Sequence, residues 1–223
     1  IPRPPGSPLF PYTTLFRSVI ARAVLYIKGL DWQLDRVAYT TQRKYGIRGA
    51  VRSIVAWLVP FGTHSWRFYP FFTIVFFTFH IGLLIVPIFL QGHSILLNER
   101  FGFSLPTISD FSADMLTIGV MVAALFLVLR RIALPEVRII TTWYDYLVLA
   151  IAVAPFLTGF LAAHRIGNYN FWLISHIISG EIMLVAIPFT KLSHFVLFFM
   201  TRMQIGMDFG IKRGGMKSKG LAW

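Results

Sequence analysis

The chain has 223 residues, of which 56% are hydrophobic and only 13% are charged, and its mean hydropathy is +0.67. A soluble domain carries about twice that share of charged residues, and a soluble chain of this composition would leave large apolar patches exposed. The formal net charge is +12, but the cations lie between long apolar runs instead of forming a basic stripe, which argues against a nucleic-acid partner. The composition predicts an integral membrane protein.

Cysteine is absent from the chain. The protein therefore forms no disulfide, and it cannot hold an Fe–S cluster through thiolates. Any redox chemistry must use a cofactor that other side chains bind.

The N-terminal segment 1–18 is rich in proline and has no apolar period. Its stretch LFPYTTLFRS resembles the translation of a sequencing adapter. If that is its origin, it has replaced the true residues of a first transmembrane helix. A helix should then continue from Val19 towards the N-terminus. A genuine proline-rich tail, extended and exposed, is the alternative. Residues Val19–Leu30 have the character of a helix end, but Arg22 and Lys28 make them a poor complete span. We expect a single membrane domain over residues 19–223.

Four later segments are apolar enough to cross the hydrocarbon of a bilayer, which takes about 20 residues of helix. We expect these spans near 69–97, 112–130, 143–164 and 171–200, with the first and the last in contact. They predict an all-α integral membrane protein.

Loop charges indicate the orientation of the spans. Lys and Arg number six in 34–67, three in 130–142 and five after residue 200, whereas 98–111 and 164–170 have one each. Cytoplasmic loops carry the excess of Lys and Arg in membrane proteins. We therefore expect a multi-pass protein of the bacterial inner membrane whose C-terminus lies in the cytoplasm.

Histidine is placed unusually in this chain. His64 lies in an amphipathic segment and His164 at the outer edge of a span, and four more lie within spans: His80, His93, His176 and His194. A polar side chain at such depth is costly, so each one needs a partner or a function. A hydrogen-bonded core histidine would explain any single case. Packing alone is a poor explanation for four histidines that are arranged as two on each of two separate helices.

The spacing of the four histidines suggests ligand pairs. His176 and His194 are 18 residues apart, which is five whole helical turns, so on one straight helix they point the same way about 27 Å apart. His80 and His93 are 13 residues apart, or about 20 Å. If the two helices are antiparallel, His80 and His194 fall in the inner half of the membrane and His93 and His176 in the outer half. Two facing histidines at one depth are what a six-coordinate haem requires.

One spacing does not fit a straight helix. His80 and His93 are about 220° out of phase, and a kink at Pro87 would be needed to turn one of them. His164 is the alternative ligand if His93 or His176 does not bind iron.

Three charged residues near the histidines have two interpretations each. Lys191, one turn before His194, would bind a haem propionate or extend to the cytoplasmic interface. Arg165 would bind an outer propionate or remain a solvated loop charge. Glu181, five residues after His176, would relay a quinone proton or bond to a neighbouring helix.

The last span, SHIISGEIMLVAIPFTKLSHFVLFF, resembles the gamma subunit of respiratory nitrate reductase, with two histidines 18 residues apart. It is still more similar to the membrane cytochrome b subunits of sulfate-reducer redox complexes, of the high-molecular-weight cytochrome c and DsrM types. The stretch 130–165 is similar to the same group, and the resemblance covers about residues 55–202.

The resemblance implies a bundle of about five transmembrane helices, the first one truncated or corrupted here, with two haem b groups and a quinone site near one of them. It implies that His80 pairs with His194 and His93 with His176. The expected protein is a quinone-reactive subunit of an oxidoreductase complex. It would carry electrons between menaquinone or ubiquinone and a cytoplasmic iron–sulfur subunit or a periplasmic cytochrome c subunit. A haem-free membrane anchor or a proton-relaying transporter subunit is the alternative.

Overall fold

The computed structural model describes residues 10–29 and 43–212, and these form helices joined by turns, without a β-strand. The expectation of an all-α protein is confirmed. Contacts divide the chain into two compact units. The first unit comprises Ile1–Thr73 and Leu184–Trp223, and the second unit comprises Ile74–Met183. That residues 19–223 act as one domain stays a prediction.

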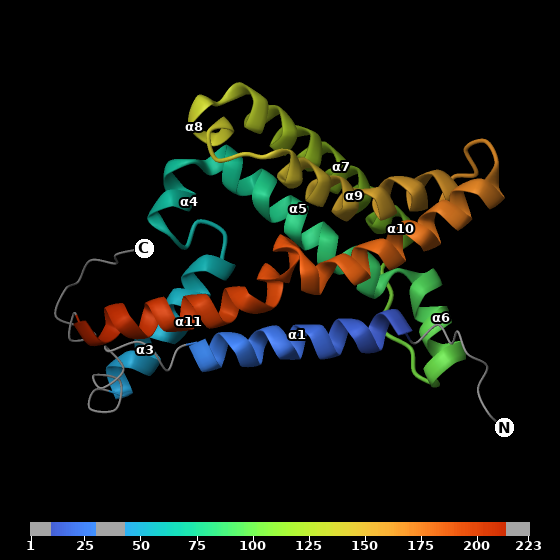
Figure 1. The fold of residues 1–223 in the computed structure, drawn as a ribbon. Helices are drawn as coiled ribbons and strands as arrows, with labels where there is room; N and C mark the ends of the chain where they lie inside the picture. The colour runs from blue at the N-terminus through green and yellow to red at the C-terminus, as the bar shows by residue number, and fades with distance from the viewer. Residues whose placement is uncertain (1–9, 30–42, 213–223) are drawn as a thin grey trace. The chain divides into compact units, whose positions relative to one another are not determined.

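Four helices among the described residues are long and apolar enough to cross a membrane (Figure 1). They are α5 (Pro70–Phe89), α7 (Asp110–Ala133), α9 (Trp143–Ala163) and α10 (Tyr169–Phe189). Their lengths of 20 to 24 residues match the roughly 20 residues that the hydrocarbon requires. The chain is a multi-pass membrane protein by this measure, as its hydropathy predicts.

The helix expected over 69–97 is divided in two. α5 ends before Leu90, which is extended (φ −68°, ψ 134°), and α6 (Gln91–Phe101) begins after it. Pro87, in the last turn of α5, lacks the backbone N–H that a continuous helix needs. The prediction of one helix over 69–97 is therefore wrong, and the expected kink at Pro87 takes the form of a break three residues later.

The loop after α6 satisfies the backbone at this break. The N–H of Ile108 donates to the carbonyl oxygen of Phe89 at 3.0 Å. The hydroxyl of Ser94, on α6, donates to the carbonyl oxygen of Leu105 at 2.9 Å and accepts the N–H of Leu105 at 3.0 Å. An unpaired backbone group is costly away from water, so these bonds stabilise the direction in which α6 carries His93.

The helix expected over 171–200 is also divided, so this prediction is wrong as well. α10 contains a proline near its end, an extended residue, Thr190, follows it, and α11 (His194–Lys212) begins after a short 3-10 turn. His176 and His194 therefore lie on different helices. Their 18-residue spacing does not make them point the same way, because that inference required an unbroken helix.

In the second unit, α5, α7 and α9 form the core. Its buried residues are Phe79, Val86, Val120, Ala123, Ala124 and Phe156. Gly82 on α5 lies so close to α7 that an added Cβ would collide with Val120 and lie 3.2 Å from the carbonyl oxygen of Leu116. Small residues permit this kind of close approach between membrane helices. The short helix α8 (Pro135–Arg138) lies in the connection between α7 and α9.

In the first unit, α3 (Arg43–Leu58) packs along α11, as Figure 1 shows. A Cβ added to Gly206 on α11 would lie 2.5 Å from the carbonyl oxygen of Gly49 on α3, and a Cβ on Gly210 would lie 2.5 Å from the carbonyl oxygen of Tyr45. The two glycines of α11 are four residues apart, which is the spacing of a close membrane-helix crossing. Backbone contact between α3 and α11 therefore holds this unit together.

Two further helices of the first unit lie within the described residues. α4 (His64–Phe68) is capped by Thr63, whose hydroxyl accepts the N–H of Trp66 at 3.1 Å. α1 (Phe10–Gly29) is tied to α11 by the hydroxyl of Tyr26, which donates to the side-chain carbonyl of Gln204.

The helix expected to run back from Val19 is present as far as Phe10, so this part of segment 1–18 is not an extended arm. One proline, Pro11, lies in its first turn, where proline is tolerated. Residues 1–9 lie outside the described part of the chain. α1 is not among the four candidate spans, so its role as a fifth transmembrane helix stays a prediction.

Replacing Gly206 with Ala is expected to lower the free energy of unfolding by about 1–3 kcal/mol, because the new methyl group would press on the backbone of α3. The same change at Gly180 is a matched control, since a Cβ there meets no heavy atom within 4 Å. Because Gly180 lies in the interior of a helix, Gly180→Ala should raise the free energy of unfolding by about 0.5–1 kcal/mol. Denaturant unfolding in detergent measures both variants. Equal effects at the two positions would contradict the crossing.

Candidate functional site

Two of the four histidines in the predicted spans come together within the second unit. The imidazole rings of His93 on α6 and His176 on α10 have centroids 5.9 Å apart, and their planes differ by 5°. An imidazole nitrogen lies about 2 Å from a transition metal that it binds, so two imidazoles on opposite sides of one metal have centroids roughly 6 Å apart. The centroid spacing of these two rings is therefore close to that of two imidazoles bound to one metal.

Each of these rings is oriented by the carbonyl oxygen of a proline. The Nδ1–H of His93 donates to the carbonyl of Pro87 at 2.8 Å, and the Nδ1–H of His176 donates to that of Pro155 at 2.8 Å. A carbonyl can only accept, so the proton is on Nδ1 and the lone pair is on Nε2. Metal-binding histidines are held in this way. Both rings are therefore in the tautomer that a metal requires.

Gly159 on α9 makes room for the ring of His176. A Cβ at Gly159 would lie 2.8 Å from both Cε1 and Nδ1 of that imidazole. Beside it, the hydroxyls of Thr158 and Ser179 are 3.1 Å apart and join α9 to α10, and Ser179 also donates to the carbonyl of His176 at 3.0 Å. Sequence reasoning missed these contacts; a glycine one turn after Pro155 was the available signal.

His80 lies on α5, in the same unit, and is half-buried. Its Nδ1–H donates to the carbonyl oxygen of Phe76 at 2.8 Å. The ring packs on Phe76, with centroids 4.1 Å apart, and edge-on to Phe79 at 5.4 Å. Since a carbonyl oxygen can only accept, the Nδ1 of His80 also carries a proton.

His194 is the first residue of α11 and belongs to the other unit. Its Nδ1–H donates at 2.9 Å to the carbonyl oxygen of Lys191, which opens the 3-10 turn η3 (Lys191–Ser193). The side chains of both residues are exposed. The pairing of His194 with His80 joins the two units and stays a prediction, as does a propionate contact for Lys191.

His164, the alternative ligand, has both ring nitrogens engaged. Nδ1–H donates to the carbonyl oxygen of Phe160 at 3.0 Å, and Nε2 lies 3.3 Å from Oδ2 of Asp114 on α7. A ligand role would require this pair to separate, so the geometry favours His176 over His164. Arg165, the next residue, is exposed in the turn with a φ of 52°, and its contact with a propionate stays a prediction.

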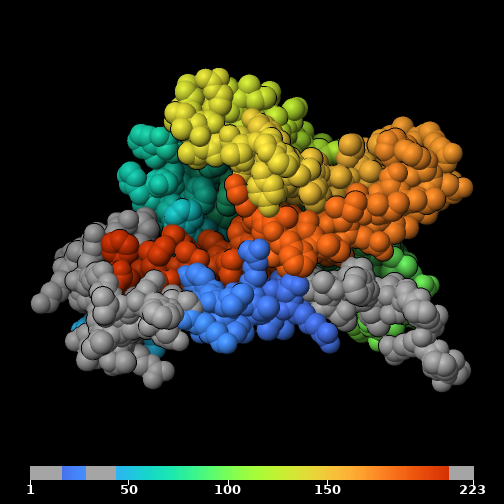
Figure 2. All heavy atoms as spheres, viewed as in Figure 1, coloured from blue at the N-terminus to red at the C-terminus, as the bar shows by residue number. Residues whose placement is uncertain are grey.

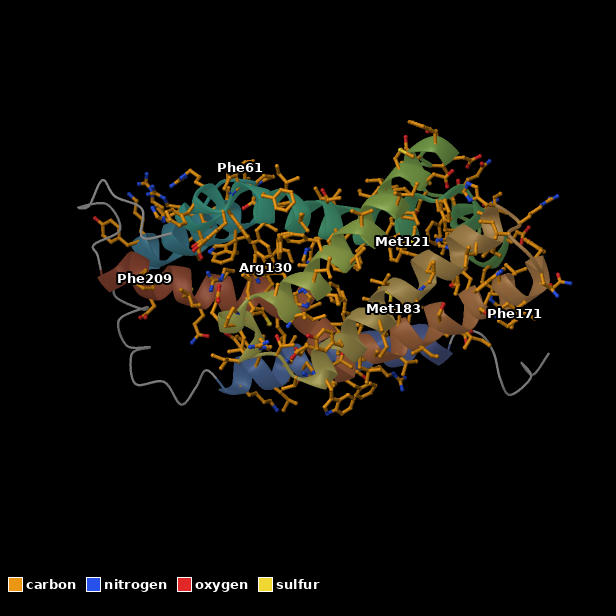
Figure 3. All side chains as sticks on the ribbon, turned by 90° about the horizontal axis from the view of Figure 1, so that it is seen from above. Phe61, Met121, Arg130, Phe171, Met183 and Phe209 are labelled. Carbon is orange, nitrogen blue, oxygen red and sulfur yellow. The ribbon has the colours of Figure 1, made fainter. Side chains whose placement is uncertain are left out.

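Glu181 is exposed on α10 and makes no hydrogen bond or ion pair with another residue in the described ranges. α10 is also the least buried of the four spans. Of its most apolar 18-residue stretch 6% is buried, compared with 22–28% for the other three spans. Figure 2 shows its residues, in orange, as an open surface, and Figure 3 labels Phe171 and Met183 along this helix. A charged side chain in a membrane span marks a candidate functional residue, and the relay role of Glu181 stays a prediction.

The fold and the site define an all-α, multi-pass membrane protein with a pair of parallel histidine rings. Within the described ranges no three His, Asp or Glu side chains gather into a group that could hold a metal ion.

Comparison with known proteins identifies a relative. A protein of Nitratidesulfovibrio vulgaris (strain Hildenborough), which carries only the name "Protein", is 58% identical over 200 residues, or 90% of this chain and 88% of that one. The chain belongs to the same family as this protein. No protein-family model matches the chain, and no solved structure matches it significantly.

A double-mutant cycle with Asp114→Asn and His164→Phe should give a coupling energy of about 0.2–1 kcal/mol, because both side chains are more than one-third exposed, at 35% and 40%. Thermal unfolding of the two single variants and the double variant in detergent measures the coupling. Fully additive effects of the two substitutions would contradict the contact at 3.3 Å.

Proposed function

We propose that this protein is a membrane-embedded dihaem cytochrome b subunit that transfers electrons across the membrane between a quinone pool and the partner redox subunits of a respiratory complex. The observation that carries the proposal is the His93–His176 pair. Its rings are parallel within 5° at 5.9 Å, and both Nδ1–H groups are donated to proline carbonyls. In this proposal, the two Nε2 atoms would hold one haem b.

The second haem would be held by His80 and His194. Each of these residues donates its Nδ1–H to a backbone carbonyl, of Phe76 and Lys191 respectively. Such a bond fixes the orientation of the ring and leaves Nε2 as the basic nitrogen. Metal-binding histidines usually make a hydrogen bond of this kind through the ring nitrogen that does not bind the metal. When bound, haem supplies a one-electron carrier, and two such carriers at different depths divide a roughly 30 Å barrier into shorter transfers.

The remaining charged residues would serve these sites. Lys191 and Arg165 supply cations for haem propionates. Glu181 supplies a carboxylate in a hydrophobic span, where it can accept a proton released by menaquinol or ubiquinol.

The proposed location is the bacterial inner membrane with the C-terminus in the cytoplasm, because cations are concentrated in the loops on that side. The proposed partners are a cytoplasmic iron–sulfur subunit or a periplasmic cytochrome c subunit, since this chain has no cysteine to bind an Fe–S cluster.

One observation favours a second function. The His164–Asp114 pair and Glu181 are titratable groups in or beside spans, as a proton-relaying transporter subunit or haem-free anchor with bound protons would have. A reduced-minus-oxidised optical spectrum of the purified protein separates the two functions, because the second one predicts no haem bands.

Replacing His176 with Ala should lower the haem content from two per chain to one, because its Nε2 is proposed as an axial ligand. Replacing His194 with Ala should remove the other haem. His164→Ala is the matched control and should leave both, because its Nε2 faces Asp114 at 3.3 Å. Haem per chain is measured from the pyridine haemochrome spectrum of purified protein. If the first two variants each keep two haems, the proposed ligand scheme is wrong.

A further inference from the structure

Helix α3 has two faces of different character. Its small residues, packed towards α11, are buried: Gly46, Gly49, Ala50 and Ser53. The rest of the helix is largely exposed. α3 carries four cations and no Asp or Glu, so the charge on its exposed face is not balanced within the helix.

The exposed face consists of two adjacent rows of side chains. Residues four apart lie one above the other on a helix. The basic row is Lys44, Arg48 and Arg52. The aliphatic row is Ile47, Val51 and Val55, whose side chains are 49%, 56% and 52% exposed. Between the rows is a shallow open hollow lined by Arg48, Val51, Arg52 and Val55.

The two arginines of the basic row, Arg48 and Arg52, are exposed. Neither Arg48 nor Arg52 makes a hydrogen bond or ion pair with another residue in the described ranges. α3 also lies close to the membrane along the chain, since only residues 59–69 separate it from the first span, α5. A helix with cations beside exposed aliphatic side chains is typical of the membrane–water interface.

We propose that this face of α3 binds an anionic phospholipid. The guanidinium groups of Arg48 and Arg52 would bind the phosphate, for which arginine has a matching fork of donors, and an acyl chain would cover Val51 and Val55. Anionic lipids are concentrated in the cytoplasmic leaflet, so the site rests on the orientation inferred from loop charges. It does not depend on whether the protein binds haem.

The aliphatic row distinguishes this ligand from others. Free phosphate or a nucleic acid would bind the arginines but leave Val51 and Val55 exposed to water. A helix of a partner protein could cover the valines, but it would need carboxylates opposite the arginines. A phospholipid supplies both chemistries in one molecule, and the membrane supplies it at high local concentration.

The test compares thermal unfolding of the purified full chain in detergent with added dioleoyl phosphatidylglycerol or dioleoyl phosphatidylcholine, which have the same acyl chains. Phosphatidylglycerol should raise the Tm by on the order of 5 °C at saturation, and phosphatidylcholine should raise it much less. The Arg48→Gln/Arg52→Gln variant should lose the difference between the two lipids. The matched control, Arg131→Gln/Arg138→Gln, removes the same charge elsewhere and should keep it.

Two additions make the test decisive. Val51→Ser/Val55→Ser should weaken the phosphatidylglycerol effect while all the arginines remain, and inorganic phosphate alone should have little effect. If the Gln variant has an altered Tm without lipid, native mass spectrometry of bound phosphatidylglycerol replaces Tm as the readout. A full effect from inorganic phosphate, or equal lipid binding by the two double arginine variants, would overturn the proposal. So would normal lipid binding combined with loss of a copurifying partner from the Arg48→Gln/Arg52→Gln variant, since the face would then be a protein interface.

Discussion

The backbone carbonyls of two helix prolines determine where two histidines of this protein point. Inside a bilayer a polar group needs a partner within the protein, and a backbone carbonyl has two lone pairs, so it can accept a side-chain N–H as well as a helical one. Here the carbonyl oxygens of Pro87 and Pro155 accept the Nδ1–H groups of His93 and His176. Each bond satisfies an imidazole N–H and fixes the orientation of its ring at once. The parallel rings, and the function proposed for them, depend on these two bonds.

The rest of the second unit stabilises this arrangement. The break at Leu90 turns α6, and the N–H of Ile108 satisfies the carbonyl at the end of α5. Gly159 leaves room for the His176 ring, so that α9 and α10 can approach closely. A redox site benefits from ligands held by secondary structure and a second layer of hydrogen bonds, because small displacements of a ligand change its bond to the metal.

Hydropathy predicted the helical class and the presence of four spans, because about 20 consecutive apolar residues have few other uses. Helix continuity was predicted poorly. The ends of α5 and α10 depend on tertiary hydrogen bonds and on the extended residues Leu90 and Thr190, which no period in the sequence specifies. The geometric inference from His176 and His194 failed for that reason. The approach of His93 to His176 was predicted from their matched depths in the membrane. Its cause was not predicted: the helix breaks at Leu90 instead of kinking at Pro87. The engagement of His164 by Asp114 could not be predicted, since the two residues lie on different helices and 50 positions apart.

The most direct test of the central claim is electron paramagnetic resonance of the oxidised, purified protein. Low-spin ferric haem with parallel axial imidazole planes gives a rhombic signal, whereas perpendicular planes give a signal dominated by one large g value. Ring planes that differ by 5° predict one rhombic component, and that same component should disappear in both His93→Ala and His176→Ala. A rhombic signal that survives either substitution, or its absence from the unsubstituted protein, would contradict the account.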